Sequence, residues 1–189
     1  MIKCFDVLLK IKSSIHLGRG TNHIMQAMNQ GMVHVICGPG KGKSASAVGA
    51  GVLGAMAEKR VIMIQFMKGI LEKDDAELLK RLEPEMKVFR FARSHGLFVD
   101  LPEEQQIEEV INMKNGFNFA RKVMVTGECD ILILDEILGL IDWNVVSEDD
   151  VIQLLENKYS ERDVIMTGAD CPEKLRTYVD HISYIENIK

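Results

Sequence analysis

The sequence predicts an α/β fold, a doubly wound and mostly parallel sheet of the nucleotide-binding P-loop type. Short apolar runs rich in Val, Ile and Leu alternate with longer amphipathic segments along most of the 189 residues. This alternation is typical of strands joined by crossover helices. One apolar run leads into a glycine-rich turn with a Gly-Lys-Ser triplet, and another ends in Asp135 and Glu136. Both features place polar groups at the carboxyl ends of strands, where such sheets bind ligands.

Composition limits the classes of protein to consider. Hydrophobic residues make up 47% and charged residues 27% of the chain, which indicates one soluble globular domain. The net charge of −5 argues against nucleic acid or a membrane surface as a partner. The 4 cysteines form no CxxC pair, which argues against a zinc site or a disulfide framework. Cysteines without disulfide partners favour a reducing compartment, the cytoplasm.

The first 30 residues differ from the rest. They are basic, and their apolar residues are interrupted by Asp6 and Lys10, which makes a poor signal-peptide core. Two interpretations remain open: an appended helix, or a translated upstream region with the true start at Met25, Met28 or Met32. We therefore predict an N-terminal extension at residues 1–30 and a P-loop domain at residues 31–189.

The phosphate-binding loop is predicted between strand 33–37 and helix 44–58. Glycines let the backbone turn its N–H groups inward, and the positive end of the helix favours an anion. Lys43 adds a mobile cation, and the Ser44 hydroxyl can bind Mg²⁺. Cys37 stands where the strict motif has its first glycine. The candidate nucleotide-binding residues are Gly38, Pro39, Gly40, Lys41, Gly42, Lys43, Ser44 and Ala45.

The next elements are predicted from the spacing of apolar residues and from the glycine and proline residues that end helices and strands. The small residues of helix 44–58 permit close packing on the sheet, and apolar strand 61–66 leads into a loop at 67–69 on the side of the site. Helical spacing at 72–83 ends at Pro84. Strand 86–91 and loop 93–100 complete this half of the chain.

A long helix is predicted from Pro102 to Gly127, because acidic residues fill its first turn and glycine is a typical stop. Its acidic run at 103–109 is interpreted as a solvated face. Its inner stripe is predicted as Ile107, Val110, Ile111, Lys114, Phe117, Ala120 and Met124. Strand 131–134, a helix capped by Ser147, strand 163–167, a short helix opened by Pro172 and strand 181–185 follow.

The apolar strand that ends in Asp135 and Glu136 is the second chemical signal. It delivers two carboxylates to the edge of the sheet beside the predicted phosphate loop. Carboxylate and hydroxyl oxygens suit a hard divalent cation. We therefore predict that Ser44, Asp135 and Glu136 hold Mg²⁺ or Mn²⁺.

These motifs resemble those of the P-loop ATP:corrinoid adenosyltransferases over about residues 33–186. The shortened loop is similar to their Gly-x-Gly-Lys-Gly-Lys-Thr, and Gln-Phe-Met-Lys-Gly at 65–69 to their Gln-Phe-x-Lys-Gly. Leu-Asp-Glu at 134–136 and Thr-Gly at 167–168 also match. The chain departs from the family at Ala169, where an arginine is usual. In the loop before the long helix, where the family often has a tryptophan, this chain has Phe98. It also lacks the family's basic tail after the last strand.

The resemblance implies transfer of the 5′-deoxyadenosyl group of ATP to Co(I) of a corrinoid, with release of triphosphate. Lys43 and Glu136 are then the catalytic candidates. Phe98, with Leu97 and Trp143 behind it, is the candidate for the corrinoid side, against ordinary core packing as the alternative. Lys68 is a candidate contact for the phosphates or the corrinoid side chains, and His95 for phosphate or substrate. Plain solvent exposure is the alternative for both.

The partners implied are ATP, a corrinoid, a Co(II) reductase and a second copy of the chain. Two other classes of function stay open. One is a different P-loop enzyme, a kinase or ATPase, although Arg90, Arg93 and Arg121 are too scattered for a kinase lid. The other is a non-catalytic nucleotide or corrinoid carrier, which Ala169 and the missing tail would suit.

Overall fold

The fold is taken from a computed structural model, which describes residues 30–67, 80–92 and 98–189. The predicted loop residue Lys68, with His95, Leu97 and most of the predicted helix at 72–83, lies outside this description. Within the described residues, the chain from Gly31 onward forms one compact unit. The assignment of residues 1–30 as an N-terminal extension stays a prediction.

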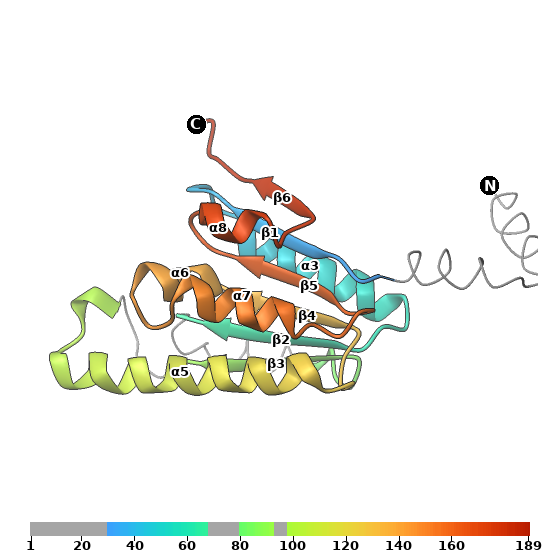
Figure 1. The fold of residues 1–189 in the computed structure, drawn as a ribbon, viewed down its shortest axis with the longest axis horizontal. Coiled ribbons are helices and arrows are strands. Elements are labelled where there is room, and N and C mark those ends of the chain that lie inside the picture. Colours follow the sequence, from blue (N-terminus) through green and yellow to red (C-terminus); the bar gives the residue numbers. More distant parts are fainter. Residues whose placement is uncertain (1–29, 68–79, 93–97) are drawn as a thin grey trace, which may run out of the picture. The chain divides into compact units, whose positions relative to one another are not determined.

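Six strands form one parallel sheet in the order β3-β2-β4-β5-β1-β6 (Figure 1). Each predicted strand is confirmed to within one residue, because each is an apolar, β-branched run bounded by turn residues. The sheet order brings the ends of β1, β5 and β4 together on neighbouring strands. The strands are β1 Val33–Cys37, β2 Val61–Phe66, β3 Met86–Phe91, β4 Ile131–Asp135, β5 Asp163–Thr167 and β6 His181–Tyr184.

Helices cover both faces of the sheet, so the core has two parts (Figure 1). On one face α3, Lys43–Met56, packs closely, since a Cβ atom added at Gly54 would lie 2.4 Å from the Ile131 side chain. The larger core lies on the other face. Its helices are α5 Glu103–Val125, α6 Ile137–Asp142 and α7 Glu148–Glu156, and α8 Glu173–Arg176 also packs there.

Local sequence signals explain where the helices begin. Ser147 caps α7 in a capping box with Asp150, as its sequence predicts. Pro102 precedes α5, whose first turn is acidic. A single turn of 3₁₀ helix, η1 Phe98–Asp100, leads toward α5. Among the helices that the structure describes, none combines the length and the apolar content needed to cross a membrane.

The predicted inner stripe of α5 is wrong at Ile107, Ile111 and Lys114, which are exposed, whereas Val110 packs partly buried against the core as predicted. Ile107 and Ile111 are 56% and 54% exposed, whereas Glu109, predicted on the solvated face, is only 3% exposed. The second half is confirmed, because Phe117, and with it Ala120 and Met124, is buried against the sheet. The helix therefore presents a different face to the core than the apolar residues of its first half suggested.

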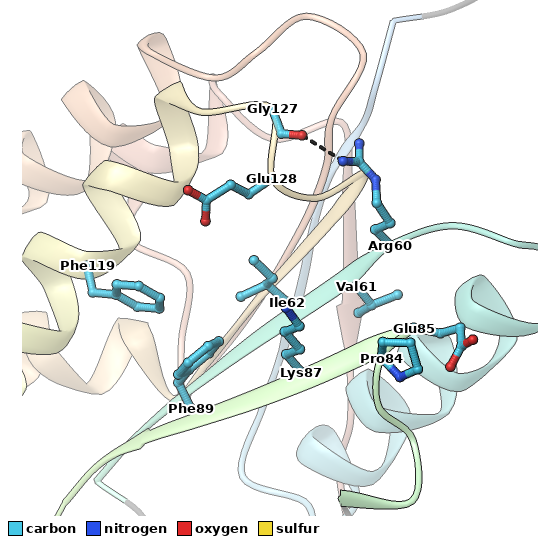
Figure 2. A pocket seen from close by; sticks show the side chains of 10 residues that line it. All are labelled: Arg60, Val61, Ile62, Pro84, Glu85, Lys87, Phe89, Phe119, Gly127 and Glu128. Carbon is cyan, nitrogen blue, oxygen red and sulfur yellow. Dashed lines mark hydrogen bonds between the residues drawn. The ribbon is translucent and has the colours of Figure 1, made fainter.

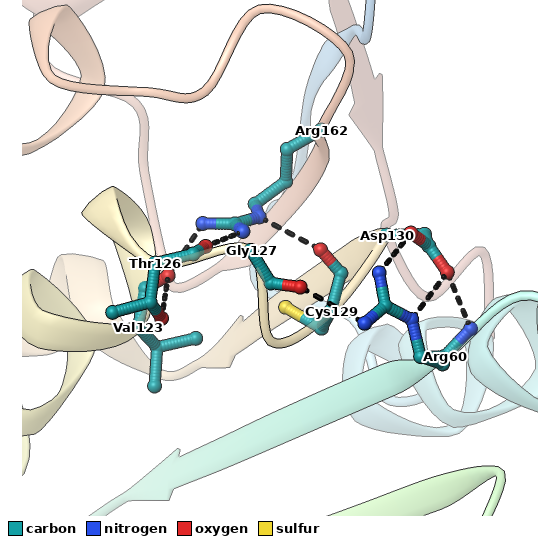
Figure 3. A network of polar contacts seen from close by, with 7 residues as sticks. All are labelled: Arg60, Val123, Thr126, Gly127, Cys129, Asp130 and Arg162. Atoms are coloured by element: carbon teal, nitrogen blue, oxygen red, sulfur yellow. Dashed lines mark hydrogen bonds and ion pairs between the residues drawn. The ribbon is translucent and has the colours of Figure 1, made fainter.

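The end of α5 is held by a buried arginine. Arg162 is 1% exposed, and its guanidinium donates hydrogen bonds to the carbonyl oxygens of Val123 at 2.5 Å, Met124 at 2.6 Å and Cys129 at 3.1 Å, and also to that of Thr126. Figure 3 shows the contacts with Val123, Thr126 and Cys129. Val123, Met124 and Thr126 lie at the C-terminal end of α5, where a helix leaves carbonyl oxygens without intrahelical partners. Cys129 belongs to the connection that follows the helix. Arg162 thus joins the start of β5 to the connection between α5 and β4.

Candidate functional site

The phosphate loop connects β1 to α3, as predicted. Gly38 and Gly42 have φ angles of 118° and 111°, which side chains other than glycine rarely adopt. Lys43 Nζ donates hydrogen bonds to the carbonyl oxygens of Gly38 at 2.7 Å and Gly40 at 3.0 Å. Lys43 is also the first residue of α3, so the positive end of the helix and the ammonium group face the same loop.

The loop is braced from two sides by backbone contacts. On one side, Gly38 N donates to Ala169 O at 2.8 Å, so the residue that replaces the family's arginine supports the loop through its main chain. On the other side, Gly40 N donates to Ile185 O at 2.8 Å, and Ile185 N donates to Cys37 O at 2.7 Å. The residues just after β6 therefore form a wall of the phosphate loop.

Replacing Gly38 should distort this brace. A Cβ atom at Gly38 would lie 2.2 Å from Ile185 O, whereas one at Gly42 would meet nothing within 4 Å. Both Gly38→Ala and Gly42→Ala carry backbone strain of about 1–3 kcal/mol. We expect Gly38→Ala to unfold at a lower urea concentration than Gly42→Ala, because only the first must also push the strand-end backbone away. Equal midpoints for the two variants would contradict this contact.

Two thiols lie beside the loop and are uncharged at neutral pH. Burial raises the pKa of Cys37, and burial together with the neighbouring Cys37 raises the pKa of Cys171 to about 11. Cys37, which replaces the first glycine of the strict motif, therefore adds no negative charge against a phosphate group. A neutral, buried thiol is compatible with anion binding at this position.

The structure brings Ser44 and Asp135 together. Asp135 ends β4 and is fully buried, and its Oδ1 accepts hydrogen bonds from Ser44 Oγ at 2.8 Å and Thr167 Oγ1 at 2.7 Å. Its Oδ2 accepts a hydrogen bond from Gln65 Nε2 at 2.9 Å. The predicted pairing of helix α3 with the carboxylate strand is therefore present, and residues from both neighbouring strands hold the carboxylate.

Glu136 occupies a special backbone position. Its φ of 65° is left-handed, and it precedes α6 as the N-cap residue. Its N–H donates a hydrogen bond to Thr167 Oγ1 at 2.8 Å. The hydroxyl of Thr167 thus contacts both residues of the carboxylate pair, which fixes the direction in which the chain leaves β4.

The donor set fits Mg²⁺ better than a metal held wholly by protein. Among the described residues, no group of three or more His, Cys, Asp and Glu side chains could enclose a metal ion. Mg²⁺ typically takes one or two protein oxygens and fills its octahedron with phosphate oxygens and waters. Ser44 with Asp135 and Glu136 offers such a partial set beside a phosphate loop.

The aromatic candidates also meet. The rings of Phe98 and Trp143 pack edge to face with centroids 4.5 Å apart, and Trp143 is 36% exposed. Phe98 lies in the connection after β3, and Trp143 caps the end of α6 after β4. Both connections leave the carboxyl edge of the sheet, which is the edge that carries the phosphate loop.

A separate pocket of about 470 Å³ lies at the opposite edge, where β2 and β3 begin (Figure 2). Phe89 and Phe119 form part of its wall, with ring centroids 4.8 Å apart. Arg60 also lines it, but its guanidinium is bonded to Gly127 O and Asp130. The lining contains none of the predicted site residues.

Sequence reasoning assigned no role to Gln65 or Thr167, although both contact Asp135. The sequence nevertheless contains a feature that could have identified both residues. Each is a polar residue at or near the end of an otherwise apolar strand, in the same way as Asp135. Parallel neighbouring strands place such residues side by side at one edge, and the register pairs Gln65 directly with Asp135.

Known proteins are similar to this chain in sequence or in fold. A protein of Nostoc sp. described as uncharacterized is 27% identical over 175 residues, which cover 87% of this chain but only 46% of that relative. The corrinoid adenosyltransferase of Escherichia coli K12 is 23% identical over 167 residues, which cover 88% of this chain and 82% of the enzyme. The structure of the flagellar accessory protein FlaH from Methanocaldococcus jannaschii has a TM-score of 0.55 at 18% identity and covers 91% of this chain and 79% of its own.

The FlaH likeness concerns the fold alone, and this chain spans less than half of the Nostoc relative. The family match is more extensive. Residues 29–189 match the family described as "ATP:corrinoid adenosyltransferase BtuR/CobO/CobP". This range contains the phosphate loop, the carboxylate pair and the aromatic pair. The chain therefore belongs to the ATP:corrinoid adenosyltransferase family, whose named activity is the ATP-dependent adenosylation of corrinoids.

Proposed function

We propose that this chain transfers the 5′-deoxyadenosyl group of ATP to Co(I) of a corrinoid and releases triphosphate. The observation that carries the ATP half is the 2.8 Å contact between Ser44 of the phosphate loop and Asp135. Family membership supports the corrinoid half. The curated relatives from Escherichia coli and Salmonella typhimurium carry the corresponding name.

The proposed reaction needs little acid–base chemistry from the protein. The electron pair of Co(I) attacks the 5′ carbon of ATP and becomes the new cobalt–carbon bond. The bond between the 5′ carbon and oxygen breaks, and triphosphate leaves with the electron pair of that broken bond. The tasks of the protein are then to align the two substrates and to stabilise charge on the leaving group. The loop N–H groups and Lys43 perform the second task. Mg²⁺, held by Ser44, Asp135 and Glu136, would neutralise further charge on the triphosphate.

On the corrinoid side we propose the Phe98–Trp143 pair as part of an apolar surface that excludes water from cobalt. The edge-to-face contact and the partial exposure of Trp143 support this assignment. Aromatic rings supply large apolar area with few rotatable bonds. Lys68 remains a proposed contact for the phosphates or the corrinoid side chains.

The decisive assay supplies ATP and chemically reduced corrinoid under anaerobic conditions. We expect triphosphate to appear in step with adenosylcorrinoid, because attack at the 5′ carbon releases the phosphate chain whole. The phosphorus products and the corrinoid spectrum are followed together, with ATP alone as the control. Corrinoid-independent ADP and phosphate would indicate an ATPase, and intact ATP binding without turnover would indicate a carrier.

We further propose that residues 31–189 contain the catalytic domain, since every motif lies within them. A cytoplasmic location, a homodimer and a Co(II) reductase as partner complete the proposal. Reduced cysteines support the location: Cys37, Cys129 and Cys171 are free and buried. The reductase follows from the chemistry, because the nucleophile must be Co(I).

A further inference from the structure

Gln65 has one polar atom satisfied and one that is not. It is 4% exposed and lies on β2, directly opposite Asp135 in the register of the sheet. Its Nε2 donates to Asp135 Oδ2 at 2.9 Å. Its Oε1 is buried and has no hydrogen-bond partner among the described residues. A buried acceptor without a donor destabilises the fold, so this atom calls for an explanation.

The orientation of the amide follows from the chemistry of its neighbour. A carboxylate oxygen can only accept a hydrogen bond, so the NH₂ group of Gln65 must face Asp135. Rotating the amide would set its oxygen against the carboxylate and leave its two N–H donors elsewhere. The unsatisfied acceptor is therefore a consequence of how Gln65 supports Asp135.

The missing partner must be a hydrogen-bond donor. A fully ionised phosphate has only acceptor oxygens and cannot fill this role. A water bound to Mg²⁺ is a strong donor, and protein-bound Mg²⁺ usually keeps several of its waters. Asp135, which contacts Ser44 of the phosphate loop, is the group beside which such a hydrated ion would bind.

We propose that Gln65 is a positioning residue for Mg²⁺·ATP, with Nε2 fixing the Asp135 carboxylate and Oε1 accepting a hydrogen bond from a metal-bound water. The proposal rests on the proposed function only in requiring that ATP binds with Mg²⁺. Residues that orient metal ligands typically contribute about 10- to 100-fold to metal affinity. Gln65 would thus make nucleotide binding sensitive to the metal without touching the phosphates.

The test measures ATP binding by calorimetry, with Mg²⁺ present and with the metal removed by EDTA. In Gln65→Met, which keeps the approximate volume and removes both polar atoms, we expect ATP affinity with Mg²⁺ to fall about 10- to 100-fold. Affinity in EDTA should stay within about twofold of the unmodified protein, because Gln65 is assigned no phosphate contact. A Mg²⁺ titration at fixed ATP should show the same shift.

The matched control is Met63→Leu. Met63 precedes Gln65 by two residues on β2, so it faces the same side of the sheet, and it is fully buried. A volume-conserving change there is expected to leave the Mg²⁺ dependence unaltered. If Gln65→Met fails to fold, Gln65→Asn, which withdraws the amide by one methylene, is measured instead and should show the same metal-specific loss.

The outcomes separate the inference from the proposed function. Equal losses with and without Mg²⁺, or no loss in either condition, would overturn the positioning role of Gln65. If the unmodified protein fails to bind Mg²⁺·ATP, both proposals are overturned. Metal-dependent binding that is weakened in Gln65→Met, without any adenosyl transfer by the unmodified protein, would contradict the proposed function and support the role of Gln65.

Discussion

Lys43→Ala is expected to lower the affinity for ATP by about 10- to 150-fold, as measured by calorimetry with Mg²⁺ present. The range corresponds to the loss of a charge-assisted hydrogen bond of about 1.5–3 kcal/mol. Lys43 Nζ lies within hydrogen-bonding distance of the Gly38 and Gly40 carbonyls, so its charge is already held at the loop that receives the phosphates. Little side-chain freedom then remains to be lost when ATP binds.

The control for this prediction is Lys41→Ala. Lys41 belongs to the same loop and carries the same charge, but its side chain is exposed and its backbone N–H donates to Asn187 Oδ1 at 3.3 Å. If general positive charge were the main contribution, both variants would lose affinity equally. We expect a clearly larger loss in Lys43→Ala, and equal losses would mean that the loop does not bind phosphate through Lys43.

The strands could be predicted because each is defined by its own residues. The apolar run at 61–66 and the run at 163–167 need no knowledge of their neighbours to be recognised as buried strands. Helix α6, Ile137–Asp142, was not predicted, although it follows the carboxylate pair directly. Its six residues continue the apolar run of β4, and so short a segment has too few turns to show helical periodicity.

The error in α5 has a geometric cause. At 100° per residue, Ile111 lies roughly 140° around the helix from Met124, and Glu109 lies roughly 60° from it. The predicted stripe therefore mixed two faces of a 23-residue helix. Apolar residues in the sequence do not by themselves define the buried face of a helix. That face is set by the residues that contact the sheet, such as Phe117 and Ala120.

The sequence predicts those residues of the candidate site that belong to a known motif. It does not predict the residues whose role is to hold a motif residue in place. Ser44 and Asp135 belong to motifs for which the sequence predicts direct contact with phosphate or metal. Gln65 and Thr167 act by holding Asp135, and only the strand order reveals that they flank it. Topology of this kind depends on contacts between distant parts of the chain, which local periodicity does not encode.

Arg162→Met is expected to lower the free energy of unfolding by about 3–5 kcal/mol. The guanidinium of Arg162 donates to four carbonyl oxygens around the end of α5, and methionine fills a similar space without a donor. Each buried carbonyl that loses its partner costs about 1–3 kcal/mol, and the site is too enclosed for water to replace all the bonds. The negative end of the helix dipole also loses its counter-charge.

Arg60→Met tests whether this loss reflects burial rather than the number of contacts. Arg60 also binds the connection between α5 and β4, through Gly127 O at 2.9 Å and Asp130 at 2.8 Å (Figure 3). Its side chain is 59% exposed, and that of Asp130 is 40% exposed, so water can take the place of the lost partner. Urea unfolding of both variants should therefore show a much smaller loss of stability for Arg60→Met than for Arg162→Met. Equal destabilisation of the two variants would contradict this explanation. It would mean that the burial of Arg162 is not what makes its hydrogen bonds stabilise the junction between α5, β4 and β5.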